Sequence, residues 1–95
     1  MDLVIRFSEE KNQLLKSTRG ISFEEILEFI HEGKILDDLK HPDPRRASQR
    51  IYLVKVEKHV YVVPYVIDVG NQEIFLKTIY PSRKYTNIYL KGEKS

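Results

Sequence analysis

The 95-residue chain contains no cysteine and no tryptophan, and it has only four glycines and a single methionine. Without cysteine the chain forms no disulfide, which is typical of a protein of the reducing cytoplasm. No apolar run approaches the roughly 20 residues that span a bilayer. The N-terminal segment MDLVIRFSEEKNQLL is mixed and charged, unlike a secretory signal. We therefore expect a cytoplasmic protein with no membrane-spanning segment.

The sequence also lacks the usual patterns for a metal ion or a cofactor. The three histidines, His31, His41 and His59, are scattered, and there is neither an HxxxH nor a CxxC spacing. A zinc site normally needs such ligand pairs. The few glycines do not form a phosphate-binding loop. The sequence therefore predicts no metal site and no cofactor.

What the chain does have is charge of uneven sign. Residues 1–44 contain 10 acidic and 6 basic side chains, net −4, whereas residues 45–95 contain 4 acidic and 10 basic, net +6, which together give +2. A basic half favours a surface that faces a polyanion, although ordinary solvated lysines and arginines would give the same count. The length and the 32% of charged residues fit a single globular domain over 1–95.

The first half of the chain shows one strand and two helix signals. Alternating residues predict a strand over 3–7. Ser8 is a candidate N-cap for a first helix, which should end at Gly20. Ser22 and Glu25 form a capping box that opens a second helix ending at Gly33. The apolar stripe of this second helix consists of Phe23, Ile26, Leu27 and Ile30.

The second half is rich in β-branched and aromatic residues, which predict strands. A loop over 41–49 should interrupt them, because two prolines lie within it. Pro64 should sit at a bulge or where no N–H is needed. Pro81 should end the last strand, and Ser82 should then cap a short helix, with 91–95 frayed. The predicted strands cover 35–40, 50–58, 59–68 and 72–80.

This order of elements predicts an α+β domain. We expect a small antiparallel sheet of about four strands, because all its connections read as hairpins or short loops. The sheet should pack against the two N-terminal helices and be followed by the short C-terminal helix. Both faces of the strands carry apolar residues, so the second face should also be covered, by another part of the fold or by a partner.

The segment FSEEKNQLLKSTRGISFEEILEFI resembles the opening of the BrnT family of bacterial toxins. The family's F/W-x-x-x-K-N segment, its Lys-x-x-Gly helix end and its (V/I)SFEE motif all have counterparts here. The family's Ser-x-Arg or Ala-Arg-Arg ending is similar to Ser82-Arg83 here. A tyrosine, here Tyr89, follows near the end of the last helix. The matching N-terminal positions are Phe7, Lys11, Asn12, Lys16, Gly20, Ile21, Ser22, Phe23, Glu24 and Glu25.

The resemblance implies a fold similar to that of RelE-type ribonucleases. It also implies a metal-independent endoribonuclease that arrests growth as the toxin of a type II toxin–antitoxin pair. The implied partners are RNA as substrate and a small DNA-binding antitoxin that neutralises the toxin. Operator DNA would be bound only through the toxin–antitoxin complex.

Three residues are candidates for catalysis of RNA cleavage. Arg83, at the expected start of the last helix, suits a phosphate clamp, because a guanidinium holds two phosphate oxygens at once. His41, in a loop with two arginines, suits proton transfer. Lys77 precedes Arg83 on the same predicted strand surface. Each also has an ordinary interpretation, as a solvated arginine, a loop histidine and a strand lysine.

Five further residues are candidates for RNA binding. Arg50 and Tyr52 share one strand face and suit a phosphate contact and a stacking ring, although Tyr52 equally suits the core. Lys16 and Arg19 lie on or after the first helix, where a plain polar helix face is the alternative. Lys84 follows Arg83 in a capped helix whose charges are either solvated or phosphate-binding.

Three functions remain open at this point. The first is the toxin ribonuclease. The second is a non-catalytic nucleic-acid or protein-binding module with the same fold. The third is a structural domain without any role in RNA. Metal-independent cleavage that depends on Arg83 separates the first from the others, and salt-dependent binding without cleavage favours the second.

Overall fold

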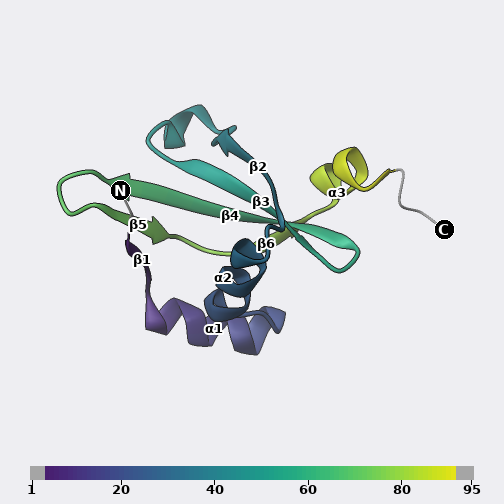
Figure 1. Ribbon diagram of the computed structural model, residues 1–95, viewed down its shortest axis with the longest axis horizontal. Helices are drawn as coiled ribbons and strands as arrows, with labels where there is room; N and C mark the ends of the chain where they lie inside the picture. Colours follow the sequence, from purple (N-terminus) through teal and green to yellow (C-terminus); the bar gives the residue numbers. More distant parts are fainter. Residues whose placement is uncertain (1–3, 92–95) are drawn as a thin grey trace.

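The computed structural model describes residues 4–91, in which three α-helices and six strands form an α+β fold. Leu3, the first residue of the predicted first strand, lies outside the described residues. So does the tail that was expected to fray, except for Lys91. None of the described helices has the length and apolar character needed to cross a membrane. Figure 1 shows the elements β1 (Val4–Phe7), α1 (Glu9–Arg19), α2 (Phe23–His31), β2 (Ile35–Lys40), the 3-10 turn η1 (Pro44–Arg46), β3 (Arg50–Val56), β4 (His59–Asp68), β5 (Glu73–Leu76), β6 (Tyr80–Ser82) and α3 (Arg83–Tyr89).

The sheet is mixed and larger than the sequence predicts. Its order is β1-β5-β4-β3-β2, and β6 also pairs with β4. The prediction of an antiparallel sheet of about four strands is wrong, because β1 joins the edge of β5 in parallel. This pairing matches Val4 with Glu73 and Phe7 with Leu76, positions that local patterns cannot connect. The other strand pairs are antiparallel.

The predicted strand over 72–80 is in fact two strands, with an irregular segment at 77–79. Lys77 N donates to the Pro64 carbonyl oxygen at 2.8 Å, and the proline has no N–H to return the bond. The pairs Tyr65–Leu76 and Val62–Tyr80 flank this irregular segment. Between them, the segment 77–79 has one more residue than the facing part of β4, which makes a β-bulge. Pro64 therefore sits at a bulge, as predicted.

Pro81 does not end a strand, which corrects a second expectation. It lies inside β6, where its register partner is Tyr61 of β4. A proline is tolerated here because β6 is short and pairs with β4 alone. The helix then begins directly after Ser82, whose side chain accepts from Tyr85 N at 3.1 Å and confirms the predicted cap.

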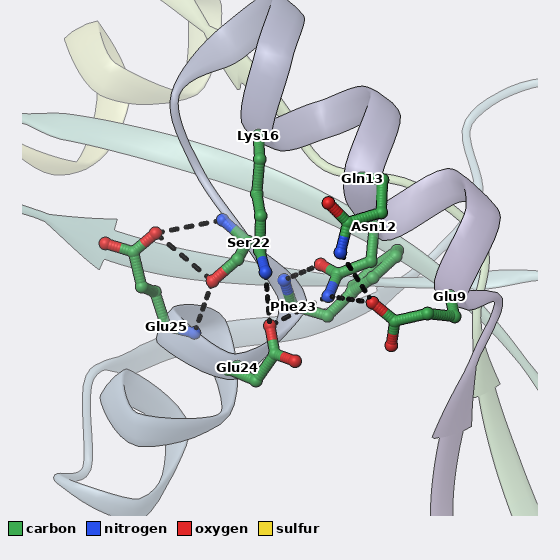
Figure 2. Close-up of polar contacts among 8 residues, drawn as sticks. All are labelled: Glu9, Asn12, Gln13, Lys16, Ser22, Phe23, Glu24 and Glu25. Atoms are coloured by element: carbon green, nitrogen blue, oxygen red, sulfur yellow. Dashed lines mark hydrogen bonds and ion pairs between the residues drawn. The ribbon is translucent and has the colours of Figure 1, made fainter.

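A buried polar contact fixes the corner between α1 and α2 (Figure 2). Asn12 is fully buried, and its Oδ1 accepts from Phe23 N at 2.8 Å. Its Nδ2 donates to Glu24 Oε1 at 2.8 Å and, more weakly, to Glu9 Oε1 at 3.4 Å. The predicted capping box of α2 is confirmed, since Ser22 and Glu25 make both reciprocal bonds. Ser8 likewise caps α1, which ends at Gly20 with a positive φ of 66°.

Both faces of the sheet are covered. On one face α1 and α2 pack Leu15, Phe23 and Ile26 against strand residues such as Val54 and Leu76. On the other face Leu90 and the α3 tyrosines pack on a second cluster of residues, Ile51, Leu53, Val60 and Val62. Figure 1 shows α1 and α2 together on one side of the sheet and α3 beside the end of the β3–β4 hairpin. This explains the apolar residues on both strand faces.

Candidate functional site

Arg83 lies in a basic pocket between α3 and the β3–β4 hairpin. The pocket has a volume of about 510 Å³. We call it the Arg83 pocket, and its lining residues are Lys58, His59, Tyr61, Pro81, Ser82, Arg83 and Thr86. It therefore combines two cations, an imidazole, a phenol and two hydroxyl groups, and none of the residues that line it is acidic. Such a set can bind a phosphate group and move a proton.

The wall of the Arg83 pocket is held by a hydroxyl bridge. Thr86 Oγ1 donates to the Ser82 carbonyl oxygen at 2.6 Å and accepts from Val60 N at 2.8 Å. Because Val60 follows His59 directly, this bridge ties the first turn of α3 to the strand that carries His59. The position of Arg83 relative to the hairpin is thus set by backbone contacts as well as by packing.

The cations of this pocket are available to an anion. Within residues 4–91, neither Arg83 nor Lys58 forms an ion pair with a carboxylate, in contrast to Arg6, Lys16, Arg45, Arg46 and Arg50. Arg83, Lys58 and His59 are all exposed. The acidic residue nearest in sequence is Glu57, at the hairpin turn, and it does not line the pocket. A bound anion would therefore not have to displace an internal partner.

His41 and Lys77 lie together in a second, smaller pocket of about 260 Å³. We call it the His41 pocket, and its lining residues are His41, Arg46, Gln49, Pro64, Lys77, Thr78 and Tyr80. It opens beside Pro64, where the pairing of β4 with β5 ends and its pairing with β6 has not yet begun. The three predicted catalytic residues are thus divided, with Arg83 in one pocket and His41 and Lys77 in the other.

Neighbouring groups orient the cations and the imidazole of the His41 pocket. His41 Nδ1 accepts from Asp43 N at 3.1 Å, so the neutral ring carries its proton on Nε2. Lys77 Nζ lies 5.5 Å from the centre of the Phe75 ring. Hydrogen bonds from Arg45, with smaller contributions from Arg46 and His41, hold the pKa of Asp43 below its ordinary value. Asp43 is therefore ionised and bound mainly to Arg45.

Arg50 and Tyr52 belong to a polar cluster on the face that α1 and α2 cover. Arg50 Nε donates to Asp38 Oδ1 at 3.1 Å, and Tyr65 OH donates to the same oxygen at 2.6 Å. The rings of Tyr52 and Tyr65 stack with centroids 4.1 Å apart. Burial raises the pKa of both phenols, and the hydrogen bond to Asp38 adds to the shift at Tyr65. A phosphate would have to displace Asp38 to reach Arg50.

The other three predicted RNA-binding residues lie in neither pocket. Lys16 Nζ is 4.0 Å from Glu24 Oε1 beside the α1–α2 corner. Arg19 Nη1 donates to the Ile79 carbonyl oxygen at 3.0 Å, inside the irregular segment at 77–79. Lys84 follows Arg83 but lies 5.5 Å from the centre of the Tyr85 ring. Arg19 thus has a clear structural contact, and Lys84 is a natural comparison for Arg83.

Sequence reasoning missed His59 and Lys58 as partners of Arg83. The pattern of residues indicates a hairpin turn there, which is correct but gives no hint of a site. Their proximity arises because β6 pairs with the start of β4, matching Ser82 with Val60. A strand ending at Pro81 would not have produced this pairing, and no local pattern indicates that β6 pairs with the start of β4.

Within the described part of the chain, no three histidine or carboxylate side chains gather into a group that could hold a metal ion. Comparison of the chain with protein-family models, with curated proteins and with solved structures finds no match in any of the three. The function is therefore argued from the two pockets and their chemistry.

Proposed function

We propose that this protein is a metal-independent endoribonuclease and the toxin of a type II toxin–antitoxin pair. The observation that carries the proposal is that His59 and Arg83 line one pocket together with Lys58, with no acidic residue in its lining. The resemblance of the KN and SFEE segments to BrnT toxins adds to it. The fold would then be RelE-like, a proposal supported by two N-terminal helices on one sheet face and a C-terminal helix on the other.

The residues of the Arg83 pocket fit the chemistry of RNA cleavage without a metal. The ribose 2′-OH loses a proton and its oxygen bonds to phosphorus, while the bond from phosphorus to the 5′-oxygen breaks and that oxygen takes a proton. Arg83 and Lys58 would stabilise the extra negative charge on the phosphorane. His59 would take the first proton, and the Tyr61 phenol is the second group able to supply one.

The biological setting follows from the same proposal. A cytoplasmic toxin of this kind arrests growth by cutting RNA and is neutralised by a small DNA-binding antitoxin. The antitoxin would cover the Arg83 pocket or pair with a sheet edge, and operator DNA would be bound only by the complex. A non-catalytic nucleic-acid-binding module is the alternative, since the same cations would bind a phosphate without cleaving its ester.

The test is incubation of the purified protein, free of any antitoxin, with RNA in EDTA. Arg83→Ala is the variant, and Lys84→Ala is its matched control, because Lys84 carries the same charge next to Arg83 but does not line the pocket. We expect cleavage by the wild type and by Lys84→Ala, and at least 100-fold slower cleavage by Arg83→Ala. RNA that stays intact with wild type but binds with steep salt dependence would favour the binding module.

A further inference from the structure

We propose that the His41 pocket is a second phosphate subsite, so that the ligand is a single-stranded polynucleotide lying across both pockets. The inference rests on the proposed function only for the class of ligand, and it needs no cleavage. It assigns a role to His41, Arg46, Lys77 and Tyr80, which lie outside the Arg83 pocket.

One guanidinium in the His41 pocket, that of Arg46, is only weakly paired. Asp43 is the acidic group nearest to Arg46, but Arg45 already binds it through three hydrogen bonds of 2.9 to 3.2 Å. Arg46 Nε is 3.9 Å from Asp43 Oδ2, beyond hydrogen-bond distance, and its side chain is 56% exposed. Arg46 therefore retains a guanidinium that can turn toward a phosphate in the pocket.

The groups around Arg46 also suit a nucleic-acid ligand. Within residues 4–91, Lys77 forms no ion pair, and it lies on the same pocket wall as Thr78. Tyr80 lines the pocket, is half-buried and packs against the apolar cluster beneath α3. Burial, with a smaller contribution from the nearby Tyr85, raises the pKa of Tyr80, so its hydroxyl remains a hydrogen-bond donor at neutral pH. Two cations beside an aromatic ring are the usual elements of a site for single-stranded nucleic acid.

Strand β6 joins the two pockets. Tyr80 lines the His41 pocket, whereas Pro81 and Ser82 line the Arg83 pocket. Tyr80 and Ser82 are two residues apart on one strand, a separation of roughly 7 Å. A single strand only a few nucleotides long would span this distance. A mononucleotide would fill one pocket and leave the other without its phosphate.

The test measures binding of 2′-O-methyl oligonucleotides, which lack the attacking hydroxyl and cannot be cleaved by this chemistry. A labelled octanucleotide and a labelled dinucleotide are titrated by fluorescence anisotropy at several salt concentrations. The variants are Arg46→Gln and Lys77→Gln. Arg6→Gln is the matched control, because Arg6 carries the same charge, is 61% exposed and lines neither pocket.

We expect each pocket variant to bind the octanucleotide about tenfold more weakly, with a salt slope smaller by about 1, and the dinucleotide as wild type does. Arg6→Gln should change the octanucleotide affinity less than twofold. Equal weakening by Arg6→Gln and Arg46→Gln would overturn the subsite, since it would show a general charge effect. Wild-type affinities that are equal for the two lengths would overturn it as well.

The same experiment separates this inference from the proposed function. Suppose that the wild type leaves RNA intact in EDTA, and that Arg46→Gln and Lys77→Gln bind the octanucleotide more weakly than the wild type does. This result would support the subsite and reject the ribonuclease. Cleavage that requires Arg83 but is indifferent to Arg46 and Lys77, with unchanged octanucleotide binding, would support the ribonuclease and reject the subsite.

Discussion

The side chain of Asn12 accepts the backbone N–H of Phe23 at 2.8 Å and so joins α1 to the first residue of α2. Asn12 and the capping-box residues Ser22 and Glu25 are among the residues that resemble BrnT toxins. In this chain they hold a helix corner together, and none of them lines either basic pocket. The motif that suggests a family therefore has a structural role here, and the proposed chemistry would depend on other residues.

Replacement of Asn12 by leucine should destabilise the fold. The leucine has a similar volume, but it leaves the buried Phe23 N–H without its acceptor and Glu24 without its amide donor. We expect the free energy of unfolding in urea to fall by about 2 to 4 kcal/mol. Gln13→Leu is the control, because Gln13 is exposed and makes one bond, to Glu9 at 2.9 Å. Equal losses in the two variants would show that the corner bonds do not matter.

Local patterns were enough to predict the helix ends. Ser8, Ser22 and Ser82 all cap the helices that they were expected to cap, and Gly20 ends α1. A cap depends on residues within three or four positions of one another, so a short stretch of sequence contains the whole signal. The α+β class followed for the same reason.

What could not be predicted depends on pairings between distant residues. The parallel partner of β1 is nearly 70 residues away, and the sequence of one strand does not indicate which strand it pairs with. The break between β5 and β6 lies opposite Pro64, which is on a different strand and has no N–H to donate. That break has two consequences for the site. Arg83 and His59 line one pocket, and His41 and Lys77 line the other.

Arg19 should contribute to stability more than to RNA binding. Its guanidinium binds the carbonyl of the fully buried Ile79 at 3.0 Å and so supports the irregular segment at 77–79. Arg19→Met should lower the free energy of unfolding by about 1 to 2 kcal/mol. Lys16→Met, which removes a contact of 4.0 Å with Glu24, should lower it by less than about 0.5 kcal/mol. If Arg19→Met lost more free energy of oligonucleotide binding than free energy of unfolding, Arg19 would be a binding residue after all.

His59 should be needed for cleavage but not for binding. His59→Asn keeps a polar side chain of similar size but removes the group that we propose accepts the 2′-OH proton, so the cleavage rate should fall about 100-fold. Affinity for the 2′-O-methyl octanucleotide should stay within twofold of wild type. His31→Asn, at the exposed end of α2, is the control and should cleave normally. Normal cleavage by His59→Asn would move the search for the base to His41.

The bond between Tyr89 and Asp37 should make the docking of α3 depend on pH at both extremes. Tyr89 OH donates to Asp37 Oδ2 at 2.8 Å, from the last residue of α3 to strand β2. This bond lowers the pKa of Asp37 below its ordinary 3.8 and raises the pKa of Tyr89 above its ordinary 10.0. Tyr89→Phe removes the bond and should lower the midpoint of urea unfolding at neutral pH.

The difference between wild type and Tyr89→Phe should be constant from about pH 5 to pH 9, where the phenol is protonated and the carboxylate ionised. It should vanish as the pH falls through the lowered pKa of Asp37, because protonation weakens the acceptor. It should also vanish as the pH rises through the raised pKa of Tyr89, because the phenolate no longer donates. Tyr85→Phe is the control, since its phenol forms no hydrogen bond among the described residues, and its effect should not fall away as the pH drops below 5. A Tyr89→Phe effect that persisted unchanged at pH 3 would show that ring packing, and not the bond to Asp37, holds α3 on the sheet.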